Sequence, residues 1–462
     1  MLSNSRPPPI VPTCTRAWST TDFTLGNGLR VFMAERADSP LTELRFVCDG
    51  GFGVDAPTQS GRAELAMAMF SDAALLNGAK LDARLTLLGA TISGRGAADG
   101  AIVAMSALAC NLPSALTLYA QSLANPHFDM RTFARVRAAR IELISRELLS
   151  PFNLASRLLA QMLFPANHQY GPSYITGGGA RTTTTLTQED IRRYFAEHLS
   201  PGRGTLIVAG GSACTEMRPL LENGFRRWRK SSSRIDSNAT TSKQHAAPLA
   251  VNENPELMLV DFPRAKQCGL FLGLRIPRQE SSLALMVVDA ISAGMFTSRL
   301  NLSLRENKGW TYGAQSWRSR TRDGGLWIIC CSVRPDRTIE SMGKIHQELQ
   351  GLASCAPCTD EELSRAINYL VGRNYSHYET CAETADALAE GLLLGQPSDY
   401  VWTFEERLRQ IDAIQVTAAC KRMLAADALR WVVVGNAAEL KMRLLKAGYQ
   451  HIQIVNAECL ST

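Results

Sequence analysis

The sequence predicts an α+β protein of two homologous, α/β-sandwich-like halves, each a mostly antiparallel sheet with helices packed on one face. Three observations predict this class. A polar segment divides the chain almost equally, both halves repeat one order of strands and helices, and both carry a hairpin turn at the same place. Hydrophobic residues are 45% and charged residues 20% of the 462 residues. This composition is typical of globular proteins and excludes a disordered or collagen-like chain.

The first residues predict a flexible leader over residues 1–21. Pro7, Pro8, Pro9 and Pro12 oppose a helix there. The segment has neither the apolar core nor the small-residue cleavage site of a secretory signal. We therefore expect a cytoplasmic protein, and a periplasmic one only if the true signal is missing from this sequence. Because no apolar run reaches the roughly 18 residues of a membrane-spanning helix, we expect no membrane contact.

The boundary between the two halves is a segment without apolar periodicity. Residues 229–256 read RKSSSRIDSNATTSKQHAAPLAVNENPE, which is rich in Ser, Thr, Asn and Lys. Such a composition predicts an exposed linker. The linker separates an N-terminal domain over residues 22–228 from a C-terminal domain over residues 257–462.

The repeat is visible in the order of elements. Each half opens with a strand, residues 44–48 and 269–274, followed by a loop and a helix. A hairpin comes next, with the turn signals Asp99-Gly100 and Asp323-Gly324. After further helices, an amphipathic helix leads into an apolar strand that ends in Gly, at residues 191–210 and 416–435. Strands and helices in this order predict antiparallel-rich sheets covered by helices.

Charge and cysteine usage narrow the function classes. The net charge of +6 is spread along the chain, so it does not indicate a nucleic-acid partner. The twelve cysteines are scattered, which favours a reducing compartment over a disulfide framework. Cys355 and Cys358 have the C-x-x-C spacing of a redox dithiol. No strand precedes them, and we expect two ordinary loop thiols.

The residues of common catalytic motifs are missing. No two of the seven histidines lie within five residues of each other, whereas a helical zinc site needs two histidines three or four residues apart. The P-loop, nucleophile-elbow and dinucleotide-binding patterns are also absent, and the run Gly177-Gly178-Gly179 predicts only a flexible loop. We therefore expect no metal and no cofactor in this chain.

One segment of the second half is distinctive. Residues 292–316 read SAGMFTSRLNLSLRENKGWTYGAQS, which resembles the pitrilysin/insulinase-type zinc metallopeptidases in their processing-peptidase branch. The family pattern is fitted by Gly294, Ser298-Arg299-Leu300, Leu304-Arg305-Glu306, Gly309 and Tyr312. Ala293 and Trp310 depart from it. The resemblance covers residues 22–436, and its specific part is the segment from Arg305, at the expected end of a helix, to Tyr312, at the expected start of a strand.

The resemblance also locates a zinc motif that this chain has lost. Active members carry H-x-x-E-H on a helix of the first half, with two zinc ligands and a general base, and a distal Glu as third ligand. The corresponding positions here are Glu64, Met67 and Ala68, and the distal position falls at Glu142 or Leu143. Ala68 has no donor atom and Met67 cannot accept a proton, so the resemblance implies a degenerate site without zinc.

The preserved residues imply a role beside a second chain. In the family, the pair equivalent to Arg305 and Tyr312 reaches across a chamber to bind peptide substrate. The resemblance therefore implies a non-catalytic, substrate-binding subunit, inactive alone, of a heterodimeric zinc metalloendopeptidase. A homologous partner with H-x-x-E-H is expected to supply the zinc. Because the loop before the S-R-L segment is short, at residues 291–297, a bacterial pair acting on short or unfolded peptides is expected.

Three other interpretations remain open at this stage. The chain could be a core-type scaffold subunit of a larger complex without a role in proteolysis. It could be a peptide-binding homodimer without activity, or an independent enzyme that uses other residues. Retention of Arg305 and Tyr312 speaks against the scaffold, which has no use for a polar pair that faces a chamber.

Overall fold

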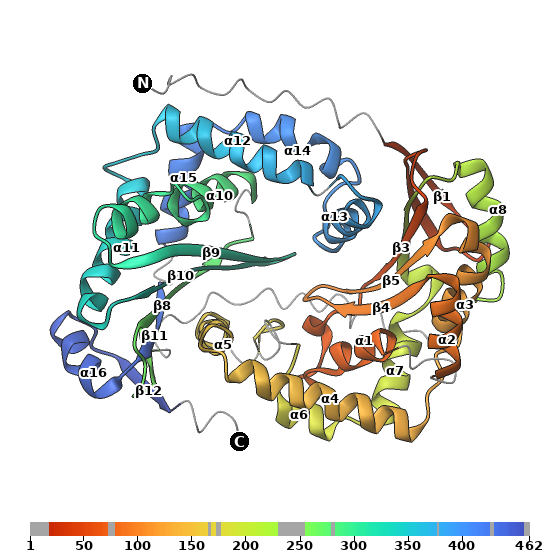
Figure 1. Ribbon diagram of the computed structural model, residues 1–462, viewed down its shortest axis with the longest axis horizontal. Helices are drawn as coiled ribbons and strands as arrows, with labels where there is room; N and C mark the ends of the chain where they lie inside the picture. Colours follow the sequence, from red (N-terminus) through yellow and green to blue (C-terminus); the bar gives the residue numbers. More distant parts are fainter. Residues whose placement is uncertain are drawn as a thin grey trace.

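The computed structural model describes residues 18–72, 79–164, 168–171, 177–229, 255–278, 282–376, 378–425 and 429–456. Residues 1–17 of the expected leader and residues 230–254 of the expected linker lie outside this set. Two six-stranded sheets with their helices form the molecule (Figure 1), so the α+β class with two repeated halves is confirmed. Among the described residues, no helix combines the length and apolarity needed to cross a membrane.

The first sheet is built from strands of the first half. They are β1 (Ser19–Thr24), β2 (Arg30–Glu35), β3 (Leu41–Cys48), β4 (Thr91–Gly96), β5 (Ala101–Leu108) and β6 (Gly204–Gly210). Their order is β1-β2-β6-β3-β5-β4. The β2–β6 pair is parallel and the other neighbouring pairs are antiparallel.

The second sheet repeats this arrangement. Its strands are β7 (Leu257–Asp261), β8 (Cys268–Ile276), β9 (Thr311–Thr321), β10 (Gly324–Val333), β11 (Arg430–Gly435) and β12 (Ile452–Asn456), in the order β12-β7-β11-β8-β10-β9. The series β7-β11-β8-β10-β9 has the same connections as β2-β6-β3-β5-β4. Only the remaining edge strand differs, because β1 precedes its sheet in the chain and is antiparallel, whereas β12 follows it and is parallel.

Helices fill the same intervals in both halves. The first half has α1 (Arg62–Ser71), α2 (Ala79–Leu88), α3 (Leu112–Ala124), α4 (Met130–Leu148), α5 (Pro151–Leu163), α6 (Ala180–Thr185), α7 (Gln188–His198) and α8 (Cys214–Phe225). The second half has α10 (Ser282–Asp289), α11 (Thr338–Ala353), α12 (Asp360–Ser376), α13 (Cys381–Leu393), α14 (Tyr400–Arg409), α15 (Ala413–Ala425) and α16 (Ala437–Lys446).

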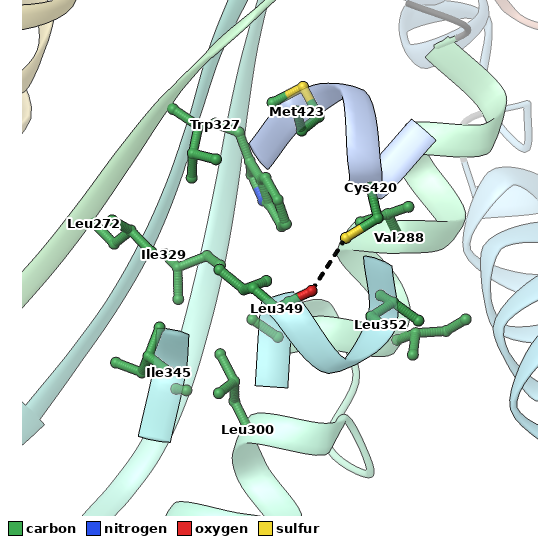
Figure 2. Close-up of a cluster of buried hydrophobic side chains, with 14 of the residues drawn as sticks. Leu272, Val288, Leu300, Trp327, Ile329, Ile345, Leu349, Leu352, Cys420 and Met423 are labelled. Carbon is green, nitrogen blue, oxygen red and sulfur yellow. Dashed lines mark hydrogen bonds between the residues drawn. The ribbon is translucent and has the colours of Figure 1, made fainter. Parts of the chain in front are cut away.

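The core of the second half lies between its sheet and helices α10, α11 and α15. Trp327 and Ile329 of β10 point to the same face of the sheet because side chains alternate along a strand. Figure 2 shows them beside Leu349 of α11. At the same place the thiol of Cys420 donates a hydrogen bond to the Leu349 carbonyl at 3.5 Å. This packing fixes α10, α11 and α15 against the sheet.

The opposite face of each sheet is covered by a helix from the other half. Helix α5 packs on β8 and β11, and α13 packs on β3 and β6 (Figure 1). Leu326 and Ile328 alternate with the core residues of β10 and therefore point to this opposite face. There they are buried in one cluster with Leu159 of α5. A Cβ atom at Gly273 of β8 would stand 2.9 Å from the Leu159 side chain, so glycine permits this close approach. The halves are therefore joined by a reciprocal exchange of helices.

The two hairpin turns predicted from Asp-Gly pairs are present and meet each other. The first lies between β4 and β5, and the second between β9 and β10. The Asp99 carboxylate accepts hydrogen bonds from the Arg322 backbone N–H at 2.8 Å and from the Tyr170 hydroxyl at 2.5 Å. The Arg322 guanidinium also contacts Asp49 at 2.7 Å. These contacts tie the tips of both sheets together.

Candidate functional site

The positions that correspond to the zinc motif lie on helix α1, which packs against β4. The left-handed backbone at Gly61 (φ 102°) turns the chain into the helix. The Asp55 carboxylate accepts hydrogen bonds from the Gly61 and Ala63 N–H groups at 3.1 and 3.2 Å, which satisfies the start of the helix. Met67 is fully buried in the hydrophobic core of the first half, and Ala68 packs against that core. Of the three positions, Glu64 alone therefore presents a polar group.

Glu64 takes part in an ion cluster with arginine. Its carboxylate lies 3.9 Å from the Arg140 guanidinium of α4. Burial, the largest cause, raises the pKa of Glu64, and Glu147 acts in the same direction while Arg140 opposes it. The carboxyl of Glu64 thus lies beside the guanidinium of Arg140.

The structure does not bring Glu142 or Leu143 to this cluster. Both are exposed, and Glu142 pairs with Arg146 at 3.3 Å. The carboxyl of α4 that is close to Glu64 is Glu147, which shares a helix face with Arg140 because seven residues make about two helical turns. Sequence reasoning missed Glu147, although the buried Ile144 between them gives the helical phase that identifies this face.

We expect the purified full-length chain to bind no stoichiometric zinc. Ala68 and Met67 offer no ligand equivalent to imidazole, and Arg140 repels a cation placed beside Glu64. Metal analysis by mass spectrometry after dialysis against a weak chelator checks this, with an H-x-x-E-H homologue as the positive control. One tightly held zinc per chain would contradict the expectation.

The buried Asp55 at the start of helix α1 makes the stability of the fold depend on pH. Burial, the largest cause, raises the pKa of Asp55 from 3.8 to about 6, and the N–H donors and Arg62 oppose this shift. The folded chain therefore binds more protons than the unfolded chain between these values. As a result, the contribution of Asp55 to stability is greatest below the unfolded pKa and falls as the pH rises through about 6.

We expect the stability of the non-titrating variant Asp55→Asn, relative to the wild type, to increase as the pH rises from about 4 to about 7. The difference in unfolding free energy should move by about 2–3 kcal/mol in favour of the variant, since each pKa unit corresponds to about 1.4 kcal/mol. Urea unfolding at several pH values measures it. A difference that does not change with pH would show that Asp55 does not titrate in this range.

The segment with Arg305 and Tyr312 is a broken helix followed by an edge strand. Helix α10 continues into π-helical turns, η6 (Ala290–Gly294), and a second such piece, η7 (Asn301–Glu306), precedes β9. Gly309, with φ 60°, separates the helix from the strand. Arg305 lies in the last turn of η7 and Tyr312 is the second residue of β9, as the sequence predicts. Strand β9 is an edge of its sheet.

Arg299 of the S-R-L sequence has a structural role. Its guanidinium contacts both carboxylate oxygens of Glu362 at 2.7 Å. It also donates to the carbonyls of Ala356 and Pro357 at 2.6 and 3.0 Å. These contacts hold the loop between α11 and α12, which contains Cys355 and Cys358. Both cysteines are free thiols, and burial is the largest cause that raises the pKa of Cys358.

Most other residues of the segment are used in packing. Ser298, Leu300 and Leu304 are buried. Asn301 is also buried, and its amide joins both sides of the segment. The side-chain N–H₂ donates to the carbonyls of Met295 and Ala314 at 3.0 and 3.1 Å, and its oxygen accepts from the Ala314 N–H at 2.8 Å. A single side chain thereby fixes the loop before η7 relative to β9.

Arg305 and Tyr312 are more exposed than these residues, although the Arg305 side chain is exposed by only 36%. The Tyr312 side chain is 89% exposed, so packing does not explain it. The Arg305 guanidinium lies 4.3 Å from the centre of the Phe296 ring and 3.3 Å from the Glu306 carboxylate. Arg305 and Tyr312 thus lie on one segment of the second half, in η7 and β9, while Glu64, Met67 and Ala68 lie on α1 in the first half.

Comparisons with known proteins match part of this chain to one family. Residues 185–370 match the family model described as "Peptidase M16 inactive domain". An uncharacterized zinc protease of Streptomyces coelicolor is 24% identical over 264 residues, which are 57% of this chain and 56% of that protein. The chain thus spans about half the length of this curated relative.

Solved structures share the fold over most of the chain. The peptidase M16 inactive domain of Pseudomonas fluorescens matches with a TM-score of 0.76 and 21% identity, over 90% of this chain and 98% of that one. A chain of complex III2 from Candida albicans matches with a TM-score of 0.73 and 13% identity, over 91% of this chain and 97% of that chain. The family match, the relatives and the shared fold lead to one conclusion: residues 185–370 are similar to the M16 peptidase inactive domain, and most of the chain has the fold of M16-like structures.

Proposed function

We propose that the chain is the non-catalytic, substrate-binding subunit of a heterodimeric zinc-dependent metallopeptidase that hydrolyses peptides in a chamber between two chains. The observation that carries this proposal is the exposure of Arg305 and Tyr312. Ser298, Arg299, Leu300, Asn301 and Leu304 of the same segment are instead occupied by packing or by hydrogen bonds within the fold. Exposed polar groups on a rigid segment without a structural task are typical of a binding surface.

The chemistry of the pair suits a peptide backbone. Arginine presents N–H donors in a fork and tyrosine presents a hydroxyl, so both can donate to a carbonyl oxygen or to the oxyanion that develops from it. The Phe296 ring supports the guanidinium of Arg305 from one side. Donors that are already oriented stabilise the charge of the transition state without reorganisation.

The partner chain would supply the rest of the reaction. The H-x-x-E-H helix of that partner would hold a zinc ion, which would supply Lewis-acid chemistry, and the Glu of the motif would act as general base. In this chain, Glu64 is matched to Arg140 and Met67 lies in the core. Helix α1 therefore serves the fold, and the contribution of this subunit to hydrolysis is to bind and orient the peptide.

Reconstitution tests the proposal against the scaffold alternative. The full-length chain is co-expressed with a homologous chain of similar length that carries H-x-x-E-H. We expect a 1:1 complex with one zinc per pair and with peptidase activity that neither chain shows alone. A homologue that is fully active without this chain would contradict the proposal, and an intact but inactive complex would favour the scaffold.

A further inference from the structure

We infer that Phe296 is a third substrate-contacting side chain, and that it gives this surface a preference for peptides with an apolar side chain next to the anchored carbonyl. The inference rests on the proposed function and deepens it. Phe296 lies in the loop between η6 and η7, before the S-R-L sequence. Its side chain is 65% exposed, so the ring is accessible to a ligand that is bound beside it.

The ring is held in place although it is exposed. Met295, the residue before it, is 5% exposed, and its carbonyl accepts hydrogen bonds from the Asn301 side chain at 3.0 Å and from the Ser298 N–H at 3.0 Å. The same Asn301 side chain binds Ala314, two residues after Tyr312. Asn301 therefore acts as a positioning residue that fixes the Phe296 loop and the Tyr312 strand relative to each other.

The contact between Phe296 and Arg305 determines which part of a bound peptide the exposed ring can contact. The guanidinium lies 4.3 Å from the ring centre, so a ligand bound by Arg305 must lie beside Phe296. The ring offers an apolar surface to the neighbouring side chain of a bound peptide. A basic side chain is disfavoured there, because the Arg305 guanidinium already lies over the ring. The substrate class is thus an extended peptide with an apolar residue at this position.

Peptide binding to the isolated full-length chain tests the inference. Three dye-labelled, N-acetylated and C-amidated hexapeptides of Ala carry Phe, Ala or Lys at one central position, and fluorescence anisotropy gives each Kd. The wild type should prefer Phe over Ala by roughly two- to tenfold, the range of an aromatic contact, and Lys should bind weakest. The ratio should approach one in Phe296→Ala and persist in Phe296→Tyr. Ile414→Ala, which alters an apolar side chain exposed by 78% on α15, should leave the ratio unchanged.

The outcomes distinguish a failure of the inference about Phe296 from a failure of the proposed function. If Arg305→Ala abolishes binding while Phe296→Ala retains the Phe preference, the inference about Phe296 is overturned and the proposed function stands. If the wild-type chain binds none of the three peptides, or if Arg305→Ala binds them as tightly as the wild type, both fail. Loss of the preference in Phe296→Ala together with its rescue in Phe296→Tyr supports the contact, since a purely structural change would weaken all three peptides equally.

Discussion

Replacing Arg305 by Ala should lower kcat/KM of the assembled peptidase by up to about 100-fold, because removal of one oxyanion donor costs roughly 10²–10³ in rate. A chamber open to water places the effect at or below the low end of this range. The fold should tolerate the change. Arg305 contacts the exposed Phe296 ring and pairs with the exposed Glu306, and such surface ion pairs contribute only about 0–1 kcal/mol.

Tyr312→Phe is the matching change on the other member of the pair. It removes one hydroxyl from a ring that is 89% exposed, so no core packing is lost. We expect a decrease of kcat/KM in the same direction and no larger than for Arg305→Ala. Arg365→Ala is the control for the loss of an exposed arginine, because Arg365 forms a comparable pair with Glu361 at 3.3 Å. Its kinetics should equal those of the wild type.

The measurement is kcat/KM of the mixed complex on a fluorogenic peptide, with gel filtration and zinc content alongside. The zinc content should not change, since the ligands lie on the partner in the proposed enzyme. Unchanged kinetics with an intact dimer would remove the substrate-binding role and favour the scaffold. Loss of the dimer itself would assign Arg305 and Tyr312 to the subunit interface.

The repeated fold could be predicted because its signals are local. The Asp-Gly turns, the apolar strands and the helix periods each depend on neighbouring residues. The exchange of α5 and α13 between the halves could not be predicted from the sequence. Periodicity shows that one face of an element is buried, but it does not show which element covers that face. One signal was present: the run Leu326–Cys331 in β10 is apolar at every position, which is typical of a strand covered on both faces.

The candidate site shows the same limit. The replacement of the zinc ligands at Glu64, Met67 and Ala68 could be read from the sequence because the motif is contiguous on one helix. Glu147 was missed because its distance from the motif along the chain does not specify the phase of α4. The contacts of Arg299 and Asn301 join segments that a linear pattern cannot place side by side, so the structure was needed to separate them from Arg305.

A buried ion pair at the end of α10 supports the segment that carries Arg305, and it gives the largest expected effect on stability. The Asp289 carboxylate is largely buried, and it accepts hydrogen bonds from the Trp327 indole N–H at 2.7 Å and from the Arg318 guanidinium at 3.0 Å. Burial, the largest cause, lowers the pKa of Arg318, and Asp289 opposes this. The carboxylate therefore compensates a cation that the surrounding protein disfavours.

Asp289→Ala should destabilise the chain by about 3–5 kcal/mol, because removal of one partner leaves a buried charge without its counterion. The indole N–H of the fully buried Trp327 also loses its acceptor. Asp289→Asn should cost less, because its amide oxygen can still accept from the indole. Urea unfolding followed by tryptophan fluorescence measures both variants. A cost below about 1 kcal/mol for Asp289→Ala, the value of an exposed pair, would mean that water reaches Arg318 and that this pair does not hold α10 to the sheet.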